Sequence, residues 1–278
     1  MLPGYNTNGF AHHKIEDALQ IIAELGYRSI AFTLDYNTLE PFAANAIARA
    51  RELGKIAQDL QLNLVIETGA RFLLDPRRKH QPTLISKQTS DRKKRADFLL
   101  RCAELGLEMG SNTLSFWSGT PDFEAAEDSY WELIIEQCVL ISRQMENSGM
   151  KIAFEPEPGM FIDTMGKFEH LHKAISHSKF GLTLDIGHLE CMNEMPLLPH
   201  LDKWGSVLWN IHLEDMRLDI FQLGFLHTSK IESFNILSDS LTIIFHSCSE
   251  TLFVSLNTFA PDAVVTFRLI KPSPLLNA

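Results

Sequence analysis

The sequence is poor in cysteine, short of basic residues and without a long apolar run. Its 278 residues contain four cysteines, and none of them has the paired spacing of a thiolate zinc site or a disulfide framework. Reduced, mostly buried thiols are therefore expected. No stretch approaches the roughly 18 apolar residues of a membrane helix, and the N-terminus lacks the basic and then apolar order of a signal peptide. The sequence thus predicts a cytoplasmic protein with no membrane partner.

The deficit of positive charge argues against nucleic acid as a partner. The formal net charge is −10 at pH 7, and an acidic protein does not broadly attract a polyanion. The charge is uneven, because residues 71–95 hold nine basic and two acidic side chains, a balance of +7 that leaves −17 for the rest. This basic segment is either a solvated loop leading into a helix or a surface that meets an anionic substrate.

What the sequence does contain is a regular alternation of short apolar runs and amphipathic stretches. Runs typical of β-strands lie near 3–7, 29–34, 62–67, 113–117, 151–155, 181–185, 208–213 and 251–256. Between them apolar residues recur at helical spacing, as in Ile15, Leu19 and Ile22. Eight such units favour an α/β fold in which residues 1–278 form a single (β/α)8 TIM barrel. No glycine-rich phosphate turn follows the first run, which argues against a doubly wound nucleotide-binding fold.

Glycines and one long connection add detail to this predicted barrel. Gly26 and Gly106 directly follow leucines at the end of helical patterns, which predicts two helix C-termini. The connection from about residue 69 to residue 90 is too long for an ordinary strand-to-helix loop. On a barrel it is predicted to lie at the C-terminal face as a lid.

Three of the apolar runs end abruptly in residues that bind metals. The runs at 152–154, 182–184 and 209–211 are followed by Glu155, Asp185 and His212. Core packing explains the runs but not the polar residue after each of them, whereas a site built on converging strand ends needs such residues. This pattern is the strongest indication of function in the sequence.

Two further residues accompany these strand ends. Glu157 leaves the fifth strand with Glu155, and the prolines of residues 156–158 hold both carboxylates in an extended, stiff segment. Glu157 is either a second carboxylate for metal binding or proton transfer, or part of an ordinary surface turn. His188 follows Asp185 by three residues, and this neighbour favours a functional role over that of an isolated structural histidine.

Three other candidates each have two interpretations. Glu67, at the end of the third strand, either binds substrate hydroxyls or forms an ion pair with Arg71. Trp117, after the fourth strand, either lines a sugar-sized pocket or belongs to the core. Arg217, five residues after the seventh strand's histidine, either clamps a carboxylate, hydroxyl or phosphate group of a substrate or joins a salt-bridged loop.

In their order along the chain these residues resemble the xylose isomerase-like barrel superfamily. Glu155, Asp185 with His188 three residues later, and His212 stand at the ends of strands five, six and seven. Within that superfamily the chain most resembles sugar phosphate isomerase/epimerase-type proteins, which have stretches similar to residues 4–13, 75–80 and 209–216. The resemblance covers roughly residues 4–217.

The resemblance implies a metal-dependent isomerase or epimerase that acts on a sugar or a sugar phosphate-like small molecule. Carboxylates at the C-terminal barrel mouth would transfer the proton beside one divalent ion, Mn²⁺, Mg²⁺, Co²⁺ or Zn²⁺. The metal would be held by Glu155, Asp185 and His212. Glu155 and Glu157 would be catalytic, and His188 and Arg217 would contact the substrate. Their positions at strand ends make Glu67 and Trp117 further candidates for substrate binding.

The last quarter of the chain, about residues 218–278, departs from this pattern. The superfamily places a fourth ligand, a glutamate, at the end of the eighth strand, where this sequence offers Ser255. Serine is a poor ligand for a divalent cation, so weaker metal binding is expected. Two alternatives therefore stand beside the isomerase: a catalytically impaired barrel that only binds a sugar, and a metal-dependent phosphodiesterase of the endonuclease type, which the acidic balance disfavours.

Overall fold

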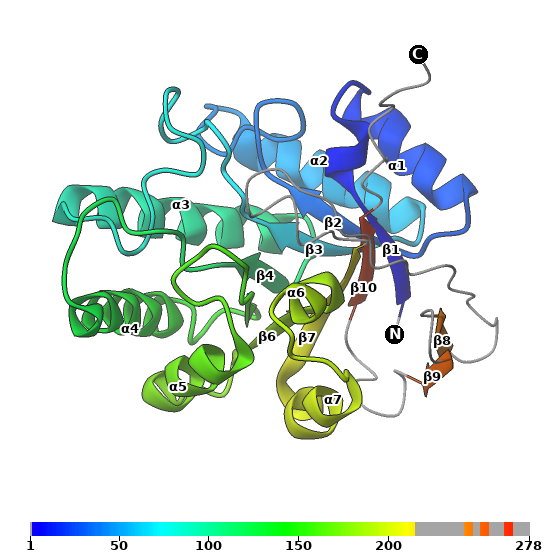
Figure 1. Ribbon diagram of the computed structural model, residues 1–278. Coiled ribbons are helices and arrows are strands. Elements are labelled where there is room, and N and C mark those ends of the chain that lie inside the picture. Colours follow the sequence, from blue (N-terminus) through cyan, green and yellow to red (C-terminus); the bar gives the residue numbers. More distant parts are fainter. Residues whose placement is uncertain (1, 215–241, 247–250, 256–263, 269–278) are drawn as a thin grey trace, which may run out of the picture.

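A computed structural model describes residues 2–214, 242–246, 251–255 and 264–268 (Figure 1). The strands are β1 (Leu2–Asn6), β2 (Ser29–Thr33), β3 (Asn63–Glu67), β4 (Thr113–Phe116), β5 (Lys151–Phe154), β6 (Phe180–Asp185), β7 (Leu208–Glu214), β8 (Thr242–His246), β9 (Thr251–Ser255) and β10 (Val264–Arg268). The α-helices are α1 (Ile15–Glu24), α2 (Ala46–Asp59), α3 (Thr89–Glu108), α4 (Glu127–Gln144), α5 (Met165–Ile175), α6 (Ile186–Cys191) and α7 (Leu198–Trp204). Two short 3-10 helices are η1 (Thr7–Phe10) and η2 (Gly205–Val207).

Strands β1 to β7 form a curled parallel sheet with helices between successive strands. The strand order is β1-β10-β7-β6-β5-β4-β3-β2, so β10 pairs in parallel with both β1 and β7 and closes the barrel. Figure 1 shows α1 to α5 packed around the outside of this sheet. Because parallel strands point the same way, their carboxyl ends meet at one mouth of the barrel.

The alternating pattern of the sequence is confirmed for the first seven strands, whose observed bounds lie within one residue of the predicted ones. Helix α1 buries Ile15, Leu19 and Ile22, which are spaced at three and four residues along one face. Between the sheet and the outer helices, the rings of Phe168 and Phe180 lie 6.5 Å apart, and Trp204 meets Phe168 edge-on at 5.0 Å. Aromatic packing thus fixes β6, which carries one of the predicted ligands.

The eighth strand of the barrel is not the one that the sequence predicted. The apolar run near 251–256 does form a strand, β9, but it pairs antiparallel with β8 in a separate two-stranded sheet. The place between β7 and β1 belongs to β10. An apolar run shows that a strand forms but not which strand it pairs with, and this caused the error. Ser255 therefore does not mark the end of the eighth barrel strand, and in β10 the residue paired with His212 is Thr266.

The two predicted helix ends had different outcomes. Helix α1 ends at Glu24, and Gly26 has a φ of +90°, which confirms a left-handed position after the helix. Gly106 lies inside α3, two residues before the end of the helix, so that prediction is wrong. A Cβ at Gly106 would lie 2.6 Å from Cγ1 of Ile66, so glycine is needed here because α3 approaches β3 closely.

The long connection predicted after β3 is present as residues 68–88, between β3 and α3. It is tied to the loop after β4 by a hydrogen bond from Thr83 Oγ1 to the Thr120 carbonyl at 3.1 Å. Within the connection, Nδ1 of His80 lies 2.5 Å from the Gly69 carbonyl oxygen, and this contact holds the two ends of residues 69–80 together. Among the described residues, the helices are too short or too polar to span a bilayer.

Candidate functional site

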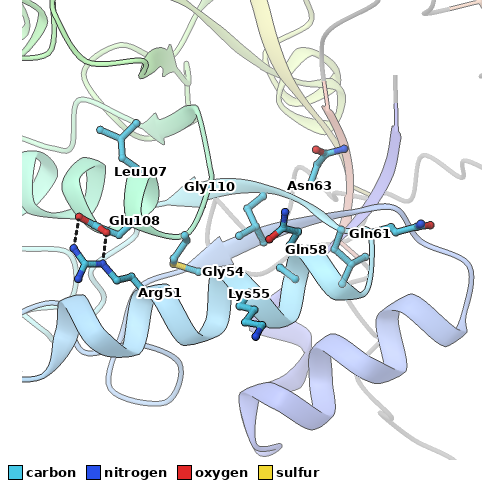
Figure 2. A pocket seen from close by; sticks show the side chains of 13 residues that line it. Arg51, Gly54, Lys55, Gln58, Gln61, Asn63, Leu107, Glu108 and Gly110 are labelled. Atoms are coloured by element: carbon cyan, nitrogen blue, oxygen red, sulfur yellow. Dashed lines mark hydrogen bonds and ion pairs between the residues drawn. The ribbon is translucent and has the colours of Figure 1, made fainter.

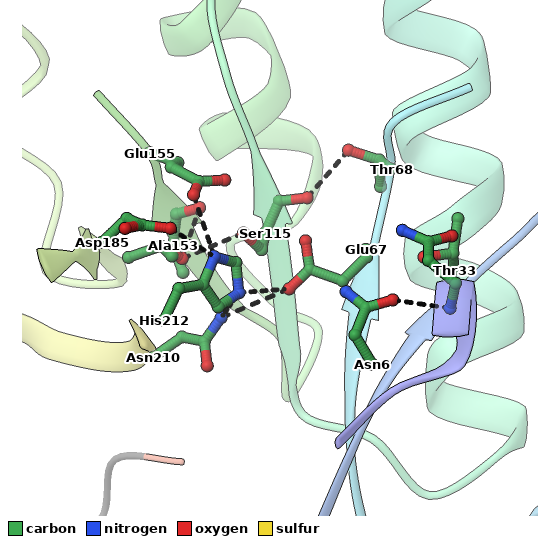
Figure 3. Close-up of polar contacts among 12 residues, drawn as sticks. Asn6, Thr33, Glu67, Thr68, Ser115, Ala153, Glu155, Asp185, Asn210 and His212 are labelled. Carbon is green, nitrogen blue, oxygen red and sulfur yellow. Dashed lines mark hydrogen bonds and ion pairs between the residues drawn. The ribbon is translucent and has the colours of Figure 1, made fainter. Parts of the chain in front are cut away.

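The ends of β5, β6 and β7 bring the three predicted ligands together. Asp185 and His212 are paired residues of neighbouring strands, and Glu155 follows the last residue of β5 (Figure 3). Each is 6% exposed or less. Nδ1 of His212 lies 2.9 Å from Oε1 of Glu155 and 3.8 Å from Oδ2 of Asp185. One imidazole nitrogen and two carboxylates therefore face a common point.

His188 approaches the same point from the other side. Asp185 caps α6, because its Oδ1 accepts a hydrogen bond of 3.1 Å from the backbone N–H of His188. The cap thereby fixes the turn that carries the histidine. Nδ1 of His188 lies 3.0 Å from the Pro156 carbonyl oxygen, and this contact requires that Nδ1 carry the proton. The lone pair is then on Nε2, which lies 3.8 Å from Oδ2 of Asp185.

Glu67 reaches the site from the opposite side of the barrel. Its Oε1 lies 3.0 Å from Nε2 of His212 and 3.3 Å from Nδ2 of Asn210. In the described part of the chain it forms no ion pair with Arg71. Burial lowers the pKa of His212, but the charges and hydrogen bonds of Glu155 and Glu67 outweigh burial and raise it well above the ordinary value of 6.5. Without a metal, the two carboxylates thus favour the protonated form of His212.

The donors of this site fit a divalent cation. Ligand atoms of Glu155, Asp185 and His188 all lie within 4.8 Å of one another, and all three residues are buried. Among the described residues, Glu67 brings the buried carboxylates of the mouth to three, beside the imidazole of His212. Buried carboxylates are stable only when they are paired or bind a cation. Carboxylate oxygen and imidazole nitrogen together suit Mn²⁺, Co²⁺ and Zn²⁺, and carboxylates also suit Mg²⁺.

Below the mouth the barrel interior is polar rather than purely apolar. Ser115 and Thr183, on β4 and β6, share a buried hydrogen bond of 2.9 Å. Thr68 Oγ1 donates to the Ser115 carbonyl at 2.8 Å.

Trp117 forms one wall beside the mouth and is 7% exposed. The guanidinium of Arg95 lies 4.5 Å from its ring centroid, and the His80 ring meets it edge-on at 5.3 Å. Arg95 is fully buried, and its Nη2 donates to the Thr68 carbonyl at 2.8 Å. Trp117 is thus almost entirely packed into the protein.

Of the predicted residues, the structure gathers Glu155, Asp185, His188, His212 and Glu67 into one cluster. Glu157 is half-buried in the loop after β5, where its backbone N–H donates to the Ile162 carbonyl at 3.1 Å. Arg217 lies outside the described residues.

Asn210 was missed because it lies within the apolar run that was assigned to packing. It is fully buried and touches both Glu67 and His212. The sequence did contain a signal for it. Asn210 stands two residues before His212 in a strand, so both side chains point to the same face of the sheet.

The sequence of this barrel is similar to those of known proteins. The family described as xylose isomerase-like TIM barrel matches residues 19–228, most of the chain. The chain belongs to the xylose isomerase-like TIM barrel family. Inosose dehydratase of Clostridium beijerinckii is 28% identical over 92 residues, which are 33% of this chain and 30% of that protein. The match therefore spans less than a third of that relative's length.

Solved structures share the xylose isomerase-like fold at low sequence identity. L-ribulose 3-epimerase gives a TM-score of 0.70 at 13% identity, covering 99% of this chain and 83% of that one. D-psicose 3-epimerase of Clostridium cellulolyticum H10, solved with D-tagatose, gives 0.68 at 14% identity over 96% and 84%. The IolI protein with a bound zinc atom gives 0.64 at 13% identity over 98% and 90%.

The xylose isomerase-like barrel also has a hollow at its opposite end, far from the polar cluster. This cavity of about 690 Å³ lies between the C-terminal ends of α2 and α3 and the beginning of β3 (Figure 2). Arg51 and Glu108, which line it, form an ion pair of 2.6 Å. Ligand sites of TIM barrels lie at the carboxyl ends of the strands, so the cluster around Glu155 is the candidate active site and this hollow is not.

Proposed function

We propose that this protein is a divalent-metal-dependent isomerase or epimerase of a sugar or sugar phosphate-like substrate. The observation that carries the proposal is the buried group of Glu155, Asp185 and His188, with His212 beside it, at the carboxyl ends of β5, β6 and β7. Sugar epimerases among the structural neighbours support the substrate class.

Glu155, Asp185 and His212 would hold the metal, with His188 at the edge of the site. A bound divalent cation would polarise a carbonyl or hydroxyl of the substrate and make the adjacent C–H bond more acidic. The zinc atom in IolI supports a cation of this kind. Zn²⁺, Mn²⁺, Co²⁺ and Mg²⁺ are the ions to test.

The protein's own groups would bind the sugar and move the proton. Glu155 would take a proton from the carbon beside the carbonyl and leave an enediolate, and a second acid would then deliver a solvent-exchangeable proton to the other face of that carbon, or either acid to its neighbour. Glu157, which leaves β5 with Glu155, is the second carboxylate for this transfer. Nε2 of His188 would accept a hydrogen bond from a substrate hydroxyl, because Nδ1 is already bonded to Pro156.

The metal content of the purified protein tests the first half of this proposal. We expect about one divalent ion per chain by mass spectrometry after loading and desalting, and much less in Glu155→Gln and Asp185→Asn. The exposed carboxylate variant Glu136→Gln, on the outer helix α4, is the matched control and should keep its metal. Equal metal in all four proteins would contradict a site at Glu155.

Proton exchange tests the second half. Incubation of the Mn²⁺-loaded protein with ketohexoses, ketopentoses and their phosphates in D₂O is expected to place deuterium on the carbon beside the carbonyl. Dehydration of an inosose-like ketone also begins with removal of such a proton, so loss of water from labelled substrate would place the protein closer to the dehydratase. Isomerised product without solvent deuterium would instead indicate hydride transfer.

A second candidate function follows from the composition of β10. Its sequence, Val-Val-Thr-Phe-Arg, contains no carboxylate, so the strand between β7 and β1 adds no acidic ligand or second base from within its length. A barrel of this kind can bind a sugar-like ligand without converting it. Sugar binding by calorimetry, with no deuterium exchange for any substrate in the presence of each metal, would favour this function over the isomerase.

A further inference from the structure

Glu67 is a buried carboxylate on the far side of the barrel from β5 and β6. It ends β3 and is 9% exposed, and its Oε1 lies 3.0 Å from Nε2 of His212 (Figure 3). The same oxygen lies 3.3 Å from Nδ2 of the fully buried Asn210. Glu67 therefore lies beside Nε2 of the imidazole, and Glu155 lies beside Nδ1.

This arrangement favours one nitrogen of His212 as a metal ligand. Both ring nitrogens face a carboxylate, which only accepts hydrogen bonds, and Nε2 also lies 3.0 Å from Nδ2 of Asn210. A cation between Glu155 and Asp185 would take the place of the Nδ1 proton, whereas the Nε2 proton would stay directed at Glu67. Nδ1, the other nitrogen, faces Oε1 of Glu155 at 2.9 Å and Oδ2 of Asp185 at 3.8 Å. In metal sites, a carboxylate commonly holds the distal N–H of the ligating histidine in this way and makes it a better ligand.

We propose that Glu67 is a positioning residue of the metal site, which holds His212 with Nε2 protonated and Nδ1 directed between Glu155 and Asp185. The inference rests on the proposed metal-dependent function. It gives Glu67 a role at the metal site in which its carboxylate binds His212 and does not touch the metal. It also replaces the expectation that Glu67 binds substrate hydroxyls. Oε1 already meets two buried donors, Nε2 of His212 and Nδ2 of Asn210.

The test measures the affinity for metal alone, in the absence of any sugar. Apoproteins are titrated with Zn²⁺ in competition with a chromophoric chelator, using wild type, Glu67→Gln, Glu67→Leu and the exposed control Glu136→Gln. Glu67→Leu is expected to lose about 10- to 100-fold in affinity. Glu67→Gln keeps a weaker acceptor oxygen and should fall between Leu and wild type, while Glu136→Gln should match wild type.

A spectroscopic measurement separates positioning from a general structural role. In the Zn²⁺-loaded wild type labelled with ¹⁵N-histidine, we expect an N–H correlation for Nε2 of His212 that exchanges slowly with solvent. In Glu67→Gln and Glu67→Leu that proton should exchange faster, whereas a purely structural role would lower stability without changing it. Thermal unfolding of each variant shows that the folded protein is being compared.

The possible outcomes distinguish this inference from the function on which it rests. If wild type binds no Zn²⁺, the proposed function fails. If wild type binds Zn²⁺ and Glu155→Gln does not, but folded Glu67→Leu binds as tightly as wild type, the positioning role alone is refuted. Should Glu67→Leu not fold, Glu67→Gln decides the matter, since unchanged affinity and unchanged Nε2–H exchange in that variant would equally overturn it.

Discussion

Gly181, in β6, is the position where the smallest substitution should disturb the site most. It lies opposite Ala153 of β5. A Cβ at this position would overlap the carbonyl oxygen of Val207 and the indole nitrogen of Trp209, and it would lie 2.7 Å from Cδ1 of Trp209. The Val207 carbonyl belongs to the backbone of the turn that leads into β7. It cannot rotate away, so Gly181→Ala must push β6 and β7 apart.

The loss of stability in Gly181→Ala depends on which atoms the added methyl group meets. Inserting one methyl group into a filled core typically costs about 1–3 kcal/mol, and a rigid backbone oxygen places Gly181→Ala at the upper end of that range. Gly166→Ala is the matched control. It lies in α5, and nothing lies within 4 Å of the added Cβ. There alanine is expected to raise the free energy of unfolding by about 0.5–1 kcal/mol, because it favours the helix.

Urea unfolding followed by circular dichroism measures both changes. Gly181→Ala should lower the midpoint at an unchanged m-value, and Gly166→Ala should keep or raise it. A Gly181→Ala protein within about 0.5 kcal/mol of wild type would refute the steric reasoning. The register that places Asp185 opposite His212 begins just beyond this point, so the folded fraction of Gly181→Ala should also bind Zn²⁺ more weakly than wild type.

Three further predictions follow from the structure. Thr266→Glu introduces a carboxylate in β10 at the position paired with His212 and should tighten Zn²⁺ binding. Ser255→Glu lies in the separate β8–β9 sheet and should not. The reverse order of affinities would contradict the observed strand assignment. Burial, followed by neighbouring positive charges, lowers the pKa of His80 from 6.5 to about 4, so the unfolded chain binds more protons between these values and the free energy of unfolding falls as the pH decreases from 6.5 to 4. His80→Asn should lose less stability across that window in urea titrations, and identical pH profiles would exclude a contribution from this histidine. Ser115→Ala and Thr183→Val should each cost about 1 kcal/mol in thermal unfolding, because each leaves a buried hydroxyl without its partner; the double variant should cost less than the sum, and strict additivity would show that the two hydroxyls are not coupled.

Local sequence pattern predicted most of the barrel because its causes are local. A strand at 29–33 or 63–67 is fully or nearly fully buried, so its run of apolar residues is visible without knowledge of its neighbours. The same reasoning located the functional strand ends. A polar residue after a buried run, such as Asp185, interrupts the apolar pattern at the point where the strand reaches the mouth.

The eighth strand shows where local pattern is insufficient. The segments 251–255 and 264–268 are both short and rich in β-branched or aromatic residues, and both form strands. Which one enters the barrel depends on pairing with β1 and β7, which are distant in sequence. Gly106 illustrates the same limit at a helix, because its role depends on contact with Ile66 of β3 and not on its place in the helical pattern.

The negative charge at the barrel mouth depends on a residue that lies far from the other carboxylates in the sequence. A superfamily site that lacks its eighth-strand carboxylate would lose one negative charge, yet this mouth contains three buried carboxylates because Glu67 approaches from β3. Glu67 meets the far nitrogen of His212, so it adds negative charge without occupying a position at the metal. Its charge favours a cation at the near nitrogen and strengthens that nitrogen as a donor. The missing β10 carboxylate therefore lowers the number of ligands more than it lowers the attraction of the site for a metal.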